Sequence, residues 1–337
     1  MTATSTPIDI HTHIVPASLP AYVGAAADIP WPSIRHTDAC HAQVIINGKN
    51  FRDIDDACWS LERRLEHTRE MGIGIEVLSP MPELLSYWLP AKDASVLARY
   101  INEQIAAMVQ AAPERYAGLG MVPLQDLDLA IEELGHVVKT LGLLGVELAT
   151  NIDGKPLGDP AFDPFFAAVV ALDAAVFVHP LRPAGMDRIV GPRSLEAVLA
   201  YPCETALAIG SMITGCVLDR HPKLRIAFSH GGGGFGQVLP RLQHSWSTNR
   251  ALHALVPHAP AETARRFYYD SLVYSETSLR FLIELFGVTQ IVLGTDHPFG
   301  IMEKHPVARI DRLALPERER ALILSGNARR FLGLDPS

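Results

Sequence analysis

Cysteine is scarce in this sequence, and the four residues present are spread along the chain. Cys40, Cys58, Cys203 and Cys216 form no CxxC pair, so we expect neither a zinc ribbon nor a disulfide framework. We expect four reduced thiols instead, as is typical of a cytoplasmic protein.

Long apolar runs and an excess of positive charge are also missing. No stretch approaches the ~18 uninterrupted apolar residues of a membrane-spanning helix, and the first residues lack the pattern of a secretory signal. Lys and Arg total 29 against 37 Asp and Glu, which gives a formal net charge of −8. This balance argues against nucleic acid or an anionic membrane as a partner. A small anionic substrate is still compatible with it, because an acidic protein can contain a local cationic pocket.

The sequence does contain a regular alternation of short β-rich runs with helical patterns. Eight such units in one chain predict an α/β fold, a (β/α)8 barrel in which residues 1–337 form a single domain. The rival fold, a doubly wound sheet, would need a Gly-rich phosphate-binding turn after an early strand. Residues 231–234 are all glycine but lack the spacing of that turn. We expect these glycines to allow a close backbone approach instead. The β-rich runs are 7–13, 74–79, 117–122, 145–149, 175–179, 225–230, 267–270 and 290–295.

The segment 16–59 departs from this alternation. Prolines interrupt its first half, and residues 42–46 and 51–54 flank an Asn-Gly-Lys-Asn sequence that predicts a β-hairpin. Inserted loops of this length are usually functional. We therefore expect this excursion to cover the mouth of the barrel.

Side chains that can bind a metal stand at the ends of four runs. His11 and His13 are two residues apart on the first strand, so they point to the same face, and later runs end at or beside His179, His230 and Asp296. The carboxyl ends of barrel strands share one mouth, so these side chains should converge. Such ligands suit Zn²⁺, with Mn²⁺, Fe²⁺ or Co²⁺ as alternatives. One of the five, His230 or Asp296, would stay off the metal and act on a bound water as a general base.

Seven motifs extend this pattern over nearly the whole chain. They are residues 8–13 (IDIHTH), 48–52 (GKNFR), 122–130 (VPLQDLDLA), 178–180 (VHP), 229–233 (SHGGG), 293–299 (LGTDHPF) and 325–328 (SGNA). Together they resemble the amidohydrolase superfamily, and within it the decarboxylase branch typified by 2-amino-3-carboxymuconate-6-semialdehyde decarboxylase.

The resemblance implies one catalytic metal, held by His11, His13, His179 and Asp296, with His230 as the acid–base partner of the metal-bound water. Binuclear relatives have a carboxylated lysine at the end of strand four, where this chain reads Gly-Val-Glu-Leu-Ala at 145–149. A single metal is therefore expected. The implied reaction is a metal-dependent, non-oxidative decarboxylation of a small unsaturated or aromatic carboxylic acid, without an organic cofactor.

The resemblance also implies two arginines that bind the substrate's carboxylates. They are Arg52, in the inserted hairpin, and Arg241, which would reach in from a neighbouring subunit and so require a homodimer. A planar guanidinium group suits bidentate carboxylate binding, although either arginine could instead be a solvated surface residue.

Other readings of the same site remain open. It could hydrolyse a lactone or an amide, or hydrate a double bond, and a closed four-ligand metal site would indicate a non-catalytic scaffold. Two departures from the family pattern, the loop at 181–186 and His297 after Asp296, are expected near the pocket mouth. Arg182 in that loop could bind a further carboxylate or be solvated. Asp270 could orient a metal ligand or make an ordinary structural hydrogen bond.

Overall fold

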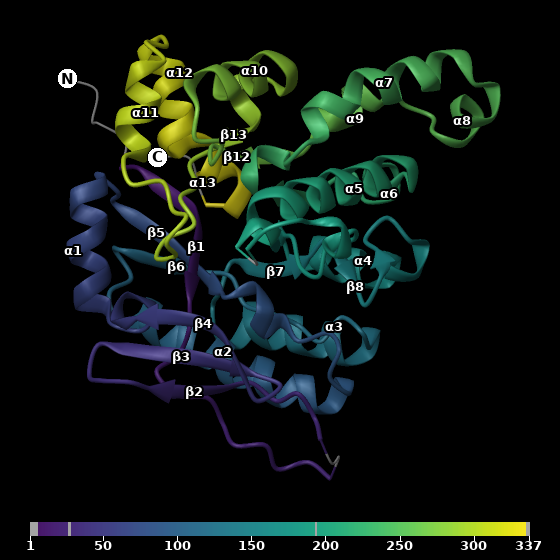
Figure 1. The fold of residues 1–337 in the computed structure, drawn as a ribbon. Helices are drawn as coiled ribbons and strands as arrows, with labels where there is room; N and C mark the ends of the chain where they lie inside the picture. Colours follow the sequence, from purple (N-terminus) through teal and green to yellow (C-terminus); the bar gives the residue numbers. More distant parts are fainter. Residues whose placement is uncertain (1–5, 26–27, 193, 335–337) are drawn as a thin grey trace.

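The chain is a closed barrel of eight parallel strands, seen in a computed structural model that describes residues 6–25, 28–192 and 194–334. The strands are β1 (Ile8–Ile14), β5 (Ile75–Pro80), β6 (Tyr116–Gly118), β7 (Gly145–Ala149), β10 (Ala175–His179), β11 (Arg225–Phe228), β12 (Tyr268–Asp270) and β13 (Ile291–Val292). They form two sheets, β1-β5-β6 and β13-β12-β11-β10-β7. A bridge from Gly120 to Val146 and a 3.0 Å bond from Ile10 N–H to the Leu293 carbonyl join these sheets. The predicted (β/α)8 barrel is confirmed (Figure 1).

Helices form the outer layer around these strands (Figure 1). Asp126 caps the third of them, its side chain accepting a 3.1 Å hydrogen bond from the Leu129 N–H. The helical segment that follows β10 is interrupted at Gly215, where a Cβ atom would lie 2.2 Å from the Gly158 carbonyl oxygen. The helices are α1 (Leu61–Met71), α2 (Ala91–Ala111), α3 (Leu127–Gly135), α4 (Asp163–Ala171), α5 (Tyr201–Thr214), α6 (Val217–Arg220), α7 (Phe235–Thr248), α8 (Arg250–Leu255), α9 (Pro260–Ala264), α10 (Glu276–Phe286), α11 (Pro306–Arg312), α12 (Glu317–Ala321) and α13 (Asn327–Leu332).

Apolar side chains fill one end of the barrel. Ile8, Ile10, Val77 and Phe177 from the strands pack there against Phe331 of the C-terminal helix α13. This plug leaves the opposite end, where the strands finish, for polar side chains.

The segment after β1 forms its own antiparallel sheet of β2 (Ser33–His36), β3 (His41–Ile46) and β4 (Lys49–Asp55). The turn between β3 and β4 is tighter than the predicted loop, with only Asn47 and Gly48 between the strands. Both residues have positive φ angles, 52° and 68°, as a two-residue hairpin turn requires. This sheet carries Arg52 toward the end of the barrel where the strands finish.

Two strands of the barrel are tied to helix α1 by an ion pair that solvent does not reach. The Arg64 guanidinium donates to both Glu76 carboxylate oxygens, at 2.9 and 3.2 Å, and to the backbone carbonyl of His13 at 2.8 Å. Burial alone would raise the pKa of Glu76, but Arg64 and His297 outweigh it and lower this pKa from 4.5 to about 2. The pair therefore supports the strand that carries His11 and His13.

Replacing Glu76 should destabilise the fold in a pH-dependent way. Because the folded pKa lies below the unfolded one, the stabilisation is complete above pH 4.5 and is lost as the pH falls toward 2. We expect Glu76→Gln to lower the free energy of unfolding by about 3 kcal/mol at pH 7, and by progressively less below pH 4.5. Denaturant unfolding at several pH values measures this. Glu66→Gln is the matched control, since its ion pair with Arg63 on α1 is exposed and worth under about 1 kcal/mol. Equal losses in the two variants would contradict the prediction.

Candidate active site

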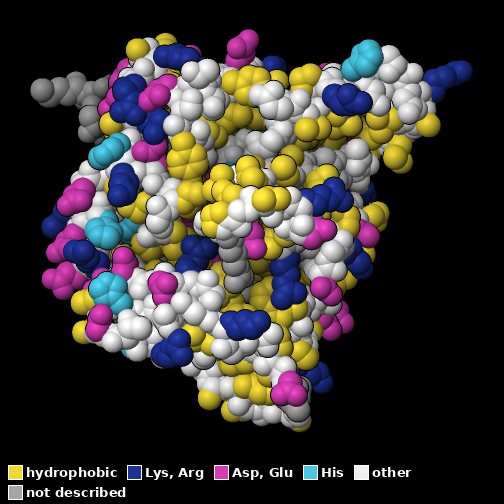
Figure 2. Space-filling model, in the orientation of Figure 1, with side chains coloured by type: hydrophobic (Ala, Val, Ile, Leu, Met, Phe, Trp, Pro, Cys, Tyr) yellow, Lys and Arg dark blue, Asp and Glu magenta, His cyan; other side chains and the backbone are white. Residues whose placement is uncertain are grey.

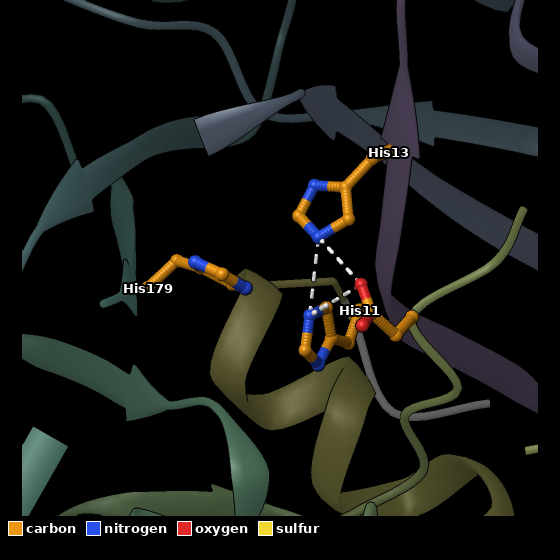
Figure 3. Close-up of side chains that lie close together, drawn as sticks. His11, His13 and His179 are labelled. Atoms are coloured by element: carbon orange, nitrogen blue, oxygen red, sulfur yellow. Dashed lines mark hydrogen bonds and ion pairs between the residues drawn. The ribbon is translucent and has the colours of Figure 1, made fainter. Parts of the chain in front are cut away.

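Four side chains converge at the open end of the barrel. His11 and His13 come from β1, His179 ends β10, and Asp296 follows β13 in a loop. All four are buried, and one ligand atom from each lies within 4.8 Å of the others (Figure 3). The structure thus brings together the complete set that the sequence suggested as metal ligands.

The three imidazole rings are oriented so that their Nε2 atoms face a common point. Each Nδ1 faces an oxygen atom: the Asp270 carboxylate at 2.6 Å from His11, the Pro80 carbonyl at 3.0 Å from His13, and the Pro180 carbonyl at 2.9 Å from His179. A ring that donates through Nδ1 has a lone pair on Nε2. The Nε2 atoms of His11 and His13 lie only 3.1 Å apart. Two lone pairs at this distance repel each other, and a cation bound by both atoms would relieve the repulsion. The residues present therefore fit a divalent metal.

Asp296 supplies the anionic ligand. Its Oδ1 lies 3.2 Å from His13 Nε2 and 3.5 Å from His11 Nε2. Burial would raise the pKa of Asp296, but the neighbouring rings of His13 and His11 lower it to about 2. Its φ of 66° is left-handed, a conformation that costs free energy in a non-glycine residue. The loop accepts this strain at the residue that completes the ligand set.

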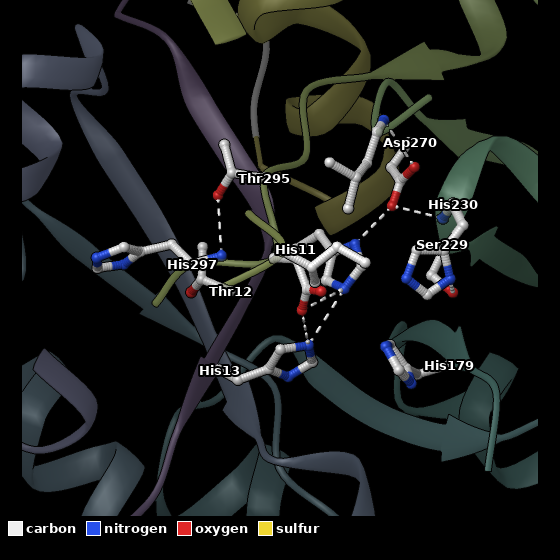
Figure 4. A network of polar contacts seen from close by, with 12 residues as sticks. His11, Thr12, His13, His179, Ser229, His230, Asp270, Thr295 and His297 are labelled. Atoms are coloured by element: carbon white, nitrogen blue, oxygen red, sulfur yellow. Dashed lines mark hydrogen bonds and ion pairs between the residues drawn. The ribbon is translucent and has the colours of Figure 1, made fainter. Parts of the chain in front are cut away.

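Asp270 connects the ligand set to His230. It bonds His11 Nδ1, and it also accepts hydrogen bonds from the backbone N–H groups of His230 at 2.9 Å and Gly231 at 2.8 Å (Figure 4). Of the two roles considered for it, the structure supports orientation of a ligand. These bonds also end β11 at Phe228, so the expected strand to residue 230 is two residues too long.

His230 lies beside the ligand set without belonging to it. Its ring centroid is 5.0 Å from that of His179 and 5.2 Å from that of His11. Burial lowers the pKa of His230 to about 4, so its imidazole is neutral near pH 7 and can accept a proton. The glycines that follow act as expected: a Cβ atom on Gly233 would lie 2.1 Å from the Pro202 carbonyl oxygen.

A cavity of about 370 Å³ is lined by His179, His230 and Asp296, and also by Arg52. The Arg52 guanidinium carbon lies 4.2 Å from the centre of the Phe299 ring, and its Nη2 lies 3.9 Å from a carboxylate oxygen of Glu83. Arg241 does not join it: it is exposed on α7 and is not among the described residues that line this cavity. Within one chain, the structure brings Arg52 and not Arg241 to the site.

Of the two departures from the family pattern, His297 lies elsewhere than expected, whereas the loop that carries Arg182 lines a cavity beside the first. His297 is buried away from the pocket mouth, with Nδ1 2.8 Å from Glu76 and Nε2 3.1 Å from His67, because its ring points away from His11 and His13 (Figure 4). The Arg182 guanidinium carbon lies 3.7 Å from the Trp88 ring centre, in a neighbouring cavity.

Sequence reasoning missed several residues of the site. Glu83 and Tyr201 line the cavity, but neither ends a strand, and no spacing pattern marks them. Glu147 lies in the middle of the fourth barrel strand, β7, with Oε2 3.7 Å from His13 Nδ1. Burial raises the pKa of Glu147 to about 8, which makes it a poor additional anionic ligand at neutral pH.

Comparison with known proteins shows which family shares this sequence and fold. A family model described as "Amidohydrolase" matches residues 8–334. The 2-amino-3-carboxymuconate-6-semialdehyde decarboxylase of Dictyostelium discoideum is 40% identical over 98% of this chain and 92% of its own length. The crystal structure of 5-carboxyvanillate decarboxylase from Sphingomonas paucimobilis superposes with a TM-score of 0.76, at 27% identity over 83% of this chain and 85% of that one. A dihydroxybenzoic acid decarboxylase from Polaromonas, solved with bound manganese, gives 0.71 at 24% identity over 82% and 87%.

The chain belongs to the amidohydrolase family. The resemblance inferred from its motifs is thereby confirmed, including the branch: the chain is a carboxy-lyase of the decarboxylase branch of that family.

Proposed function

We propose that this protein decarboxylates a small unsaturated or aromatic acid of the 2-amino-3-carboxymuconate-6-semialdehyde class, using one bound divalent metal. The observation that carries the proposal is the convergence of three imidazoles and one carboxylate beside a cavity that His179, Asp296, His230 and Arg52 line. No organic cofactor is part of the proposal.

We propose zinc as the metal, held by His11, His13, His179 and Asp296. Three imidazoles and one carboxylate are a set that zinc readily accepts, with manganese, iron and cobalt as the alternatives. When bound, such a metal acts as a Lewis acid that polarises an oxygen atom of the substrate. Asp270 and the carbonyls behind His13 and His179 keep the ligand rings oriented.

His230 would act as the acid–base group that transfers the proton during the reaction. Decarboxylation breaks the bond between a carbon and its carboxylate, releases carbon dioxide, and leaves a proton on that carbon. The neutral imidazole of His230 can take up a proton and pass it on, while the backbone bonds to Asp270 fix its position. Asp296 would contribute negative charge as a metal ligand, and Arg52 would bind a carboxylate of the substrate.

We further propose a homodimer in which Arg241 enters the partner's cavity. Arg241 is exposed on α7, which projects from the barrel with α8 (Figure 1). Exposed apolar side chains lie on the same two helices, Val238 on α7 and Leu255 on α8. A second copy would cover such apolar surface.

The segment Glu196–Thr214 is long and apolar enough to cross a membrane, but here it lies in the connection between the parallel strands β10 and β11.

The surface and the cysteines support the remaining parts of the proposal. Acidic and basic side chains are interspersed on the face shown in Figure 2, which suits a small-molecule substrate better than nucleic acid. Cys40, Cys58, Cys203 and Cys216 are free thiols, which supports a cytoplasmic location.

Carbon dioxide release from a panel of acids tests the proposed function. The panel contains 2-amino-3-carboxymuconate-6-semialdehyde, 2,6-dihydroxybenzoate and 5-carboxyvanillate, each given to metal-replete and chelator-stripped protein. We expect release from at least one acid, loss of release on stripping, and about one metal per chain by elemental analysis. No release despite a bound metal, together with turnover of a lactone, an amide or a hydration substrate, would overturn the proposal.

A further inference from the structure

A buried carboxyl group lines the wall of the substrate cavity. Glu83 follows β5, is only 4% exposed, and shares this wall with Tyr201 and Arg52. An acidic side chain is unexpected in a cavity meant for an acid, because like charges in a poorly solvated site repel. Its presence calls for a function.

The hydrogen bonds of Glu83 leave acceptor capacity unused. Its Oε1 accepts a 3.1 Å hydrogen bond from the Tyr201 hydroxyl. Its Oε2 is buried and has no hydrogen-bond partner among the described residues. Buried polar atoms nearly always have a partner, so an atom without one indicates a group that the protein alone does not supply.

Orientation of Arg52 does not account for Glu83. The closest approach, from Arg52 Nη2 to Glu83 Oε1, is 3.9 Å, which is too long for a hydrogen bond. The Arg52 guanidinium is instead stacked over Phe299. Arg52 and Glu83 thus offer the substrate opposite charges from one wall: a donor for a carboxylate, and an acceptor beside it.

We propose that Glu83 determines specificity by accepting a hydrogen bond from an amino or hydroxyl group of the substrate. The preferred substrate is then an acid that carries such a donor, and an acid with a further carboxylate at that place is disfavoured. This inference rests on the proposed function, because it names the substrate class of the same site. The amino group of 2-amino-3-carboxymuconate-6-semialdehyde and the hydroxyls of dihydroxybenzoate are donors of this kind.

Equilibrium binding tests the inference without requiring turnover. The metal-loaded protein is titrated calorimetrically with benzoate, 2-aminobenzoate and 3-aminobenzoate. We expect at least one aminobenzoate to bind about tenfold more tightly than benzoate, as a hydrogen bond to a charged group allows. Glu83→Gln should reduce this preference to about threefold or less, with benzoate affinity changed by less than about twofold. The preference is the ratio of the affinities for an aminobenzoate and for benzoate. A contact of the amino group with the metal contributes equally to this ratio in the wild type and in each variant, so it cancels when the ratios are compared.

Two further variants sharpen the test. Glu83→Asp withdraws the carboxylate by one methylene, so it should lose the preference for aminobenzoates as Glu83→Gln does. If one of these two variants fails to fold, the other still tests the inference. Tyr201→Phe removes the hydroxyl that competes for Oε1 and should keep or increase the preference.

Two results would overturn the inference. One is a wild-type protein without any preference for the aminobenzoates. The other is an equal loss of affinity for all three acids in Glu83→Gln, which would mean that Glu83 acts through Arg52. Failure of the proposed function looks different: the binding preference would persist, but no acid would release carbon dioxide.

Discussion

The His230→Gln variant is expected to lose about 10³-fold in kcat and to keep its metal. His230 lies outside the ligand set but lines the same cavity, and its low pKa leaves the imidazole neutral and able to carry a proton. Glutamine preserves the size and a hydrogen-bonding group, but it cannot take up a proton. Carbon dioxide release gives kcat, and elemental analysis of the same sample gives the metal content.

The matched control is His13→Ala, which removes one of the four converging ligand atoms. This variant is expected to lose metal and turnover together, since three ligands bind a metal more weakly than four. Parallel loss of metal and turnover in His230→Gln would instead make His230 a ligand and refute its role as the proton carrier.

The Arg241→Ala variant should be nearly inactive alone but recover on mixing with His230→Gln. If Arg241 binds a substrate carboxylate, its loss should cost about 10- to 100-fold in kcat/KM, the value of a hydrogen bond between charged groups. In a mixed dimer, the site of the Arg241→Ala chain keeps its own His230 and would receive Arg241 from its partner. Half of the dimers are mixed and half of their sites complete, so about a quarter of the wild-type activity should return.

Recovery depends on Arg241 acting across the interface. If it acts within its own chain, the mixture will show only the average of the two variants. Arg250→Ala, which changes an exposed arginine on the neighbouring helix α8, is the matched control and should stay near wild-type activity. Sedimentation of the unmixed protein measures the dimer directly, and a monomer at assay concentration would remove the basis for this proposal.

Local pattern was enough to find the site residues that come from strand ends. His11 and His13 could be placed on one face because side chains two apart on a strand point the same way. His179 and Asp296 could be joined to them because parallel barrel strands all finish at one mouth. The barrel itself followed from counting alternating units.

Contacts across the barrel were decided only by the tertiary structure. Asp270 and His11 are 259 residues apart in the chain yet 2.6 Å apart in space, and Tyr201 reaches Glu83 from 118 residues away. Strand periodicity tells which face a side chain occupies, but not which partner from another element meets it there. The burial of His297 against Glu76 had the same origin. Hydrogen-bond partners, and hence ring orientations and pKa values, depend on packing between elements that are distant in the chain. Short-range sequence patterns do not determine this packing.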